Sequence, residues 1–176
     1  MREDILIPYL KEQENPKLLA GDMSMMRHVS PEGGNDTVGY GHKLSNHEQF
    51  TGTAYGLPIE ELTEEDAQRI LKADVDRAHA AASRHLKSAY GVALEELPGR
   101  EQAMLVDYQF NVRGGISSFP SFTKAVLIGD ESTQHDEYIR HYTDAKGVRR
   151  PLARNRAFYS TFMSESAKAS FGEYSV

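Results

Sequence analysis

Thr37-Val38-Gly39-Tyr40-Gly41-His42 is the stretch that decides the fold of the first third of this chain. It interleaves β-prone residues with glycine and lies within residues 22–60, where further glycines stand at positions 33, 34, 52 and 56. Short β-prone runs separated by glycines are typical of short strands joined by tight turns. We therefore predict a small, irregular antiparallel sheet in this region.

A short amphipathic helix is predicted just before the sheet, over residues 2–13. Its apolar residues share one face at three- and four-residue spacing: Ile5, Leu6, Tyr9 and Leu10. Pro16 ends the pattern, because the residue before a proline avoids the helical region. Glu14 is thus expected at the C-terminal end of the helix, at the negative end of the helix dipole. We expect this position to raise the pKa of Glu14, which suits a proton donor.

The pattern becomes helical after Leu62. Thr63 and Asp66 form a variant of the capping box, and a single apolar face then continues to about residue 88. That face consists of Ile70, Leu71, Val75, Ala78 and Leu86. Further helices are predicted over residues 100–112, 121–128, 133–143 and 152–163.

These elements together predict an α+β fold in a single domain, residues 1–176. The sheet lobe is expected at about residues 14–60. The larger helical lobe is expected at about residues 61–176, together with the first helix. The long helix after Leu62 is expected to join the two lobes.

The composition excludes several classes of site. The 176 residues include no cysteine, which rules out disulfides, thiolate nucleophiles and zinc–thiolate centres. None of the seven histidines belongs to a His-Glu-x-x-His motif. We expect no metal and no cofactor, and the alternative is a zinc amidase or peptidase with scattered ligands.

The charge and the ends of the chain bear on its partners. A net charge of −6 predicts no nucleic-acid partner. Residues 1–10 lack the basic start and long apolar run of a signal peptide, and no stretch approaches the length of a membrane span. We therefore expect no stable membrane association. Four arginines nevertheless cluster near the C-terminus, at positions 149, 150, 154 and 156, and such a cluster is most often solvated or ion-paired.

Two acidic residues and a threonine are candidates for glycosidase chemistry. Glycoside hydrolysis typically needs an acid to protonate the leaving oxygen and a second group to handle water or the developing cation. Glu14 ends the first helix, Glu32 lies in a Pro-Glu-Gly-Gly turn, and Thr37 begins a strand. The alternative is that Glu14 is an ordinary surface acid and Glu32 an ordinary turn residue.

His42 and Asp74 form a second predicted pair. Asp74 falls on the apolar face of the long helix, and a buried carboxylate needs a partner. His42 closes the glycine-rich stretch and is the expected partner. We predict a structural ion pair in preference to a catalytic dyad.

Residues 37–42 resemble the Thr-Ile-Gly-x-Gly-His signature of phage-type lysozymes, glycoside hydrolase family 24. Three later segments are similar to further motifs of that family, in the same order along the chain. They are residues 62–76, at the start of its inter-lobe helix; Phe110-Asn111-Val112, near its Phe-Asn-Val-Gly segment; and residues 147–158, near its arginine-rich motif.

The resemblance implies a two-lobed lysozyme-like fold with a cleft between the lobes. It implies hydrolysis of the β-1,4 bond between N-acetylmuramic acid and N-acetylglucosamine in bacterial peptidoglycan, with inversion of configuration. Glu14 and Thr37 match catalytic positions, and His42 with Asp74 match a structural ion pair. Asn111 matches a substrate-contacting residue, and Arg154 is assigned to substrate binding with it.

The second catalytic acid departs from the family pattern. In the family, five residues usually separate this acid from the threonine, and counting back from Thr37 by that spacing gives Pro31. Glu32, one position nearer, is the best substitute, and Asp22 and Asp36 are poorer candidates. The interval from Glu14 to Thr37 is also longer than usual.

The implied biological role is that of a monomeric phage endolysin that stays in the host cytoplasm until a holin pore releases it to the cell wall. A tail-associated wall-piercing enzyme is an alternative to this role. Two alternatives to the hydrolase activity also stay open. One is a lytic transglycosylase that cuts the same bond without water. The other is a non-catalytic wall-binding or virion structural domain.

Overall fold

The computed structural model describes residues 1–29, 34–112, 114–143 and 147–171. Over these ranges the chain combines many helices with small antiparallel sheets, which agrees with the α+β part of the predicted fold. Its contacts divide it into two compact units. We call Asp4–Arg77 the sheet unit, and Met1–Glu3 with Ala78–Val176 the helical unit.

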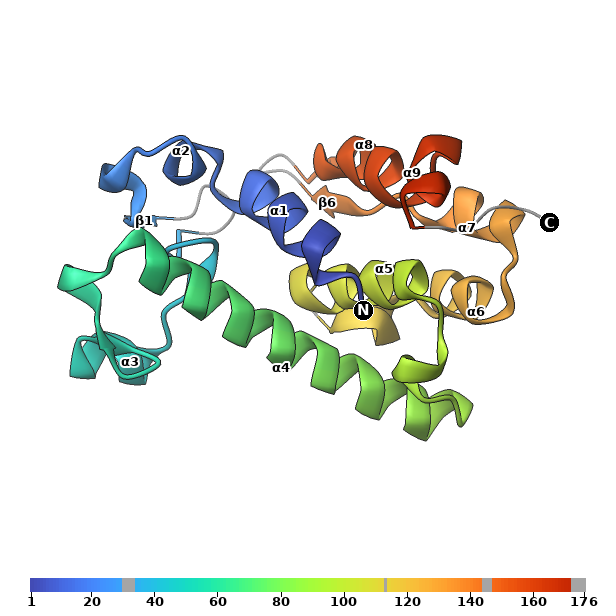
Figure 1. Ribbon diagram of the computed structural model, residues 1–176, viewed down its shortest axis with the longest axis horizontal. Helices are drawn as coiled ribbons and strands as arrows, with labels where there is room; N and C mark the ends of the chain where they lie inside the picture. The colour runs from blue at the N-terminus through green and yellow to red at the C-terminus, as the bar shows by residue number, and fades with distance from the viewer. Residues whose placement is uncertain (30–33, 113, 144–146, 172–176) are drawn as a thin grey trace. The chain divides into compact units, whose positions relative to one another are not determined.

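The sheet unit contains most of the first helix, a three-stranded sheet and the first half of the long helix (Figure 1). Its elements are α1 (Glu3–Glu14), α2 (Pro16–Leu19), η1 (Met23–Met25), β1 (Arg27–Val29), β2 (Asp36–Val38), β3 (His42–Lys43), α3 (Asn46–Thr51), β4 (Thr53–Ala54), β5 (Leu57–Pro58), η2 (Ile59–Glu61) and the start of α4 (Glu64–Tyr90). The antiparallel sheet has the order β1-β2-β3.

Helix α1 ends at Glu14, as predicted, and Pro16 begins the next helix. Asn15 is the one residue between these two helices, and it is only 3% exposed. Its side-chain oxygen accepts from the Leu18 N–H at 3.1 Å. Its amide nitrogen donates to the carbonyls of Met25 at 3.0 Å and Gly39 at 2.9 Å. Asn15 therefore fixes the end of α1 against η1 and the glycine-rich stretch.

Two glycines of that stretch take backbone conformations that glycine favours. Gly39 and Gly41 have φ values of 57° and 88°. A Cβ at Gly39 would lie 3.0 Å from the Cβ of Ala67 on α4. Gly39 therefore lets the loop after β2 pack directly on the long helix.

Helix α3 is one of the helices in this unit that were not predicted. Residues 22–60 were expected to form only a sheet with turns, but α3 spans Asn46–Thr51. Ser45 and Glu48 form a complete capping box at its start. The Ser-x-x-Glu spacing was present in the sequence, so this helix start was predictable.

The start of α4 confirms the predicted capping box. The Thr63 N–H donates to Asp66 Oδ2 at 3.1 Å, and the Asp66 N–H donates to Thr63 Oγ1 at 3.2 Å. The predicted apolar face, Ile70, Leu71, Val75, Ala78 and Leu86, is buried throughout.

The helical unit is built around α5. Its elements after the second half of α4 are η3 (Leu94–Glu96), α5 (Gly99–Asn111), η4 (Gly115–Ser118), α6 (Pro120–Ile128), α7 (Glu131–Glu137), β6 (His141–Thr143), β7 (Arg149–Pro151), α8 (Arg154–Phe158), a π-helical segment (Tyr159–Met163) and α9 (Glu165–Ser170). Every residue from 100 to 108 is buried, so α5 forms the centre of this unit.

A buried ion pair lies in this core. Asp107 on α5 is 0% exposed and accepts from Arg140 Nη1 at 2.7 Å. The Arg140 guanidinium also lies over the rings of Tyr108, at 4.5 Å, and Phe158, at 4.8 Å. Because an isolated charge in this environment is costly, the pair holds the segment after α7 against α5.

The predicted helix over residues 133–143 is wrong in its second half. Helix α7 ends at Glu137, and strand β6 begins at His141. Arg140 hydrogen-bonds through its backbone to the Asn155 side chain instead of to a helical neighbour: its N–H donates to Oδ1 at 3.1 Å, and its carbonyl accepts from Nδ2 at 2.8 Å. This contact between distant residues replaces the helix.

The helices predicted over residues 100–112 and 121–128 match α5 and α6. The one predicted over 152–163 corresponds to α8 and the π-helical segment that follows it. None of the described helices has both the length and the apolar character needed to cross a membrane.

Asp107→Ala removes the carboxylate and leaves Arg140 buried without its partner. We expect the free energy of unfolding to fall by about 3–5 kcal/mol, as for other broken buried pairs. Denaturant unfolding measures the change. Asp136→Ala is the matched control, because Asp136 is an exposed acid of the same unit, and its effect should stay within about 0.5 kcal/mol. Equal losses in the two variants would contradict a stabilising role for the pair.

Candidate functional site

Glu14 packs directly against the glycine-rich stretch. A Cβ at Gly41 would lie 2.7 Å from Glu14 Oε2 and 3.2 Å from its carboxyl carbon. Any side chain at position 41 would therefore displace the carboxylate. The structure brings Glu14 to the segment that also carries Thr37, and the buried neighbour Asn15 fixes the backbone from which Glu14 extends.

Thr37 lies in the central strand of the sheet. It stands opposite His28 on β1 and Lys43 on β3, and it is only 4% exposed. Its hydroxyl donates to the Asn35 carbonyl at 3.0 Å. A hydroxyl whose proton is committed in this way keeps its lone pairs as acceptors. Thr37 is thus set to accept a hydrogen bond, for example from a water molecule.

The second catalytic acid was predicted at Glu32, which lies outside the described residues. Asp36, one of its alternatives, accepts from Arg27 through both oxygens, at 3.2 and 2.8 Å. The hydrogen bonds and charge of Arg27 lower the pKa of Asp36. Asp22, the other alternative, caps η1 by accepting from the Ser24 N–H at 3.1 Å. Both aspartates therefore already have structural partners.

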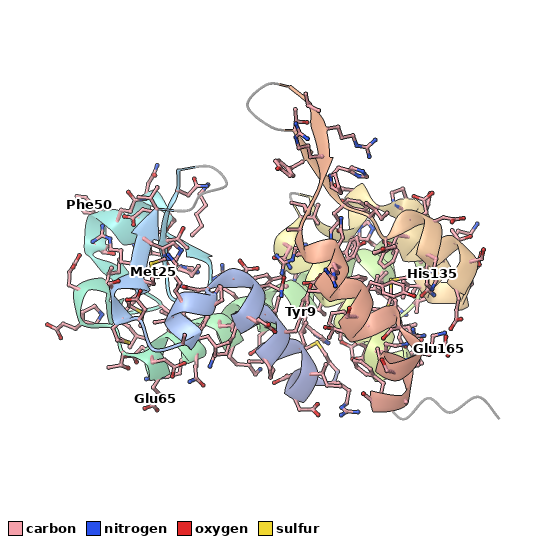
Figure 2. All side chains as sticks on the ribbon, turned by 90° about the horizontal axis from the view of Figure 1, so that it is seen from above. Tyr9, Met25, Phe50, Glu65, His135 and Glu165 are labelled. Atoms are coloured by element: carbon pink, nitrogen blue, oxygen red, sulfur yellow. The ribbon has the colours of Figure 1, made fainter. Side chains whose placement is uncertain are left out.

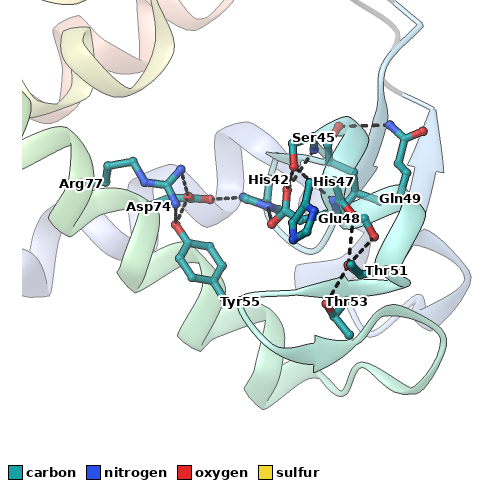
Figure 3. Close-up of polar contacts among 11 residues, drawn as sticks. His42, Ser45, His47, Glu48, Gln49, Thr51, Thr53, Tyr55, Asp74 and Arg77 are labelled. Atoms are coloured by element: carbon teal, nitrogen blue, oxygen red, sulfur yellow. Dashed lines mark hydrogen bonds and ion pairs between the residues drawn. The ribbon is translucent and has the colours of Figure 1, made fainter.

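The structure brings His42 and Asp74 together. His42 Nδ1 lies 2.8 Å from Asp74 Oδ2, and His42 Nε2 lies 3.0 Å from Glu48 Oε1 (Figure 3). The Tyr55 hydroxyl donates to the other oxygen of Asp74 at 2.6 Å. Glu48 also belongs to the capping box of α3. The imidazole therefore ties β3 to both α3 and α4.

Two carboxylates set the charge of this histidine. Burial alone lowers the pKa of His42, but the hydrogen bonds and charges of Asp74 and Glu48 outweigh it, so the net pKa is raised above 6.5. Both ring nitrogens face acceptors, an arrangement that fits the protonated imidazolium. A histidine held in this way acts as a cationic link between elements and is poorly suited to accept a proton.

Asn111 and Arg154, the predicted substrate residues, also lie together, at the end of α5 and the start of α8. Arg154 Nη1 donates to Asn111 Oδ1. Asn111 Nδ2 donates to the Asp107 carboxylate at 2.6 Å, and Arg154 Nη2 lies 3.5 Å from the same oxygen. The buried Asp107 thus orients both side chains. These residues belong to the helical unit, whereas Glu14 and Thr37 belong to the sheet unit.

Sequence reasoning missed three residues that position the candidates: Asn15, Glu48 and Asp107. The capping-box spacing could have identified Glu48. Asn15 could have been identified as the N-cap that precedes Pro16, but its contacts with Met25 and Gly39, and the pairing of Asp107 with Arg140, join residues distant in sequence. Over the described ranges, no cluster of three or more His, Asp or Glu residues could hold a metal ion.

The raised pKa of His42 gives its ion pairs a defined pH dependence. A group whose pKa is higher in the folded state than in the unfolded state stabilises the folded protein when it is protonated. This stabilisation is complete below the unfolded-state pKa and is lost as the pH rises through the folded-state pKa. His42→Asn should therefore destabilise the protein most below pH 6.5. The difference from wild type should shrink at alkaline pH.

Denaturant unfolding across this pH range checks the expectation. His47→Asn is the control, because His47 is an exposed histidine on α3, and it should show little loss at any pH. A loss at His42 that stays constant with pH would contradict the ionic role of the imidazole.

No family model matches the chain, and no curated protein matches it. The functional assignment therefore rests on the geometry of these residues and on the sequence motifs.

Proposed function

We propose that the chain is a muramidase with a lysozyme-like fold, hydrolysing the β-1,4 bond between N-acetylmuramic acid and N-acetylglucosamine in peptidoglycan. Glu14 is its catalytic acid, Glu32 its second acid and Thr37 its water-positioning residue. Asn111 and Arg154 contact the substrate. His42 and Asp74 form a structural ion pair and take no part in the reaction.

The observation that carries the proposal is the contact between Glu14 and Gly41. The proposal needs an acid held firmly beside the segment that bears the nucleophile-positioning residue. A Cβ at position 41 would lie 2.7 Å from Glu14 Oε2, so the carboxylate lies directly against the backbone of this segment.

In the proposed reaction, protonated Glu14 donates its proton to the glycosidic oxygen, and the bond to the anomeric carbon breaks. A water molecule donates a hydrogen bond to Thr37 Oγ1, which directs an oxygen lone pair toward that carbon. The water attacks from the opposite face, so the configuration inverts. Glu32 stabilises the developing positive charge and takes up the proton of the water.

The other candidates for the second acid support this choice by exclusion. Asp36 is held by Arg27 and Asp22 by Ser24. Moving either carboxylate to a substrate would cost these contacts. Glu32 therefore remains the acid to test first.

We assign the enzyme to phage-driven lysis, acting as a monomer on the cell wall after release through a holin pore. This role follows from the resemblance of residues 37–42 and of the later segments to phage-type lysozymes. No cofactor takes part in the proposed reaction.

Glu14→Gln removes the transferable proton and preserves the size of the side chain. We expect the release of reducing ends from purified peptidoglycan to fall by about 10²- to 10⁴-fold, the usual contribution of a general acid. Glu12→Gln is the matched control, because Glu12 is an exposed glutamate on the same helix, and it should retain wild-type activity. Wild-type activity in Glu14→Gln would overturn the proposal.

The same assay compares the three candidates for the second catalytic acid. Glu32→Gln should reduce the rate strongly, whereas Asp22→Asn and Asp36→Asn should alter stability more than rate. A larger rate loss at either aspartate would move the role away from Glu32 and leave the role of Glu14 intact.

A further inference from the structure

His28 on β1 carries a side chain that the proposed reaction does not use. It is the cross-strand partner of Thr37, directly opposite it in an antiparallel pair. Side chains in such positions project to the same face of a sheet, with Cβ atoms about 4.5–5.5 Å apart. His28 is only partly buried. A ligand that approaches the Thr37 hydroxyl therefore also comes close to the imidazole.

A backbone carbonyl holds the ring of His28. His28 Nδ1 lies 3.0 Å from the carbonyl oxygen of Met25, at the end of η1. A carbonyl can only accept hydrogen bonds, so Nδ1 carries a hydrogen and donates it. Met25 lies in the blue N-terminal part of the sheet unit (Figure 2). This bond fixes the orientation of the ring and the position of its hydrogen.

The same carbonyl links His28 to the end of α1. Asn15 Nδ2 also donates to the Met25 oxygen, at 3.0 Å, so both lone pairs of that oxygen are used. Asn15 is the residue after Glu14. The imidazole is therefore joined through one oxygen to the residue next to the proposed catalytic acid. Through the sheet it is the neighbour of the proposed water-positioning residue.

The second ring nitrogen of His28 is available as an acceptor. When Nδ1 carries the hydrogen of a neutral imidazole, Nε2 keeps its lone pair. Among the described residues, Nε2 has no hydrogen-bond partner. Covering this nitrogen with a ligand costs free energy unless a donor on the ligand replaces its bond to water. The sugars of peptidoglycan carry such donors, in their hydroxyl groups and in the N–H of each acetamido group.

We propose that His28 is a substrate-binding residue of the sheet unit, and that its Nε2 accepts a hydrogen bond from the acetamido N–H of the sugar bound at Thr37. The acetamido group lies on the carbon next to the one that the water attacks, so its N–H is the ring donor closest to Thr37. This inference rests on the proposed muramidase function, because that function brings an acetamido sugar to Glu14 and Thr37. Asn111 and Arg154, the other residues assigned to the substrate, belong to the helical unit.

Two substitutions separate substrate binding from a purely structural role of His28. His28→Asn places an amide nitrogen where Nδ1 lies, so it keeps the bond to the Met25 carbonyl and removes the acceptor at Nε2. His28→Gln places an amide oxygen near the position of Nε2 and loses the bond to Met25. Asparagine therefore replaces a histidine that only holds η1, whereas glutamine is the better replacement for one that binds the substrate.

Binding is measured in the full chain carrying Glu14→Gln, so that the probe is not cleaved. The probe is a soluble peptidoglycan tetrasaccharide without peptides, titrated by calorimetry. We expect His28→Asn to weaken binding about three- to tenfold, the scale of one neutral hydrogen bond, and His28→Gln to weaken it less. Denaturant unfolding should show the opposite order, with the larger loss of stability in His28→Gln. His47→Gln, at an exposed histidine of α3, is the control and should change neither quantity.

Steady-state kinetics of the chain with native Glu14 give a second readout. The loss in His28→Asn should appear in kcat/KM for reducing-end release, mainly through a higher KM, because the contact is already present when the substrate binds. Unchanged affinity in His28→Asn, or equal losses of affinity in His28→Asn and His28→Gln, overturns the proposal. Reducing-end release by the wild-type chain tests the muramidase function separately, so the failure of one idea is distinguishable from the failure of the other.

Discussion

The sheet unit depends on close approaches that only glycine allows. Gly41 accepts the Glu14 carboxylate against its backbone, and Gly39 accepts Ala67 of α4. Asn15 bonds to the carbonyls on both sides of this junction, in η1 and in the glycine-rich stretch. The end of α1, the sheet and the start of α4 therefore meet at one stretch of six residues. The candidate acid is part of that junction.

Buried charge orders the helical unit in a comparable way. Asp107 pairs with Arg140 and orients Asn111 and Arg154. A carboxylate without exposed surface is tolerated only when its partners are complete. The predicted substrate residues thus depend on a core interaction that contacts no substrate itself. A loss of activity in an Asp107 variant can therefore arise from a loss of folding stability, so its stability should be measured first.

The sequence predicted features that are encoded locally. The end of α1 at Glu14, the Thr63–Asp66 capping box and the apolar face of α4 each follow from residues a few positions apart. The pairing of His42 with Asp74 was reached from a longer argument, that a carboxylate on an apolar face needs a partner.

Features that arise from distant partners were not predicted. The β6–β7 hairpin begins within the second half of the helix predicted over residues 133–143, because Arg140 bonds to Asn155 and Asp107 instead of to its helical neighbours. Its strands are exposed on both faces, so they show no alternation of apolar and polar residues. The contact of Glu14 with Gly41 was likewise invisible, because a sequence shows the glycine but not what fills the space beside it.

The central claim is that Glu14 acts as the acid of a hydrolase on the muramic acid bond. Mass spectrometry of the products released from purified sacculi by the wild-type chain tests it most directly. The account predicts fragments that end in reducing N-acetylmuramic acid. Anhydro-muramic ends would show transglycosylation, and intact glycan strands, whether or not peptides are cleaved, would contradict muramidase activity altogether.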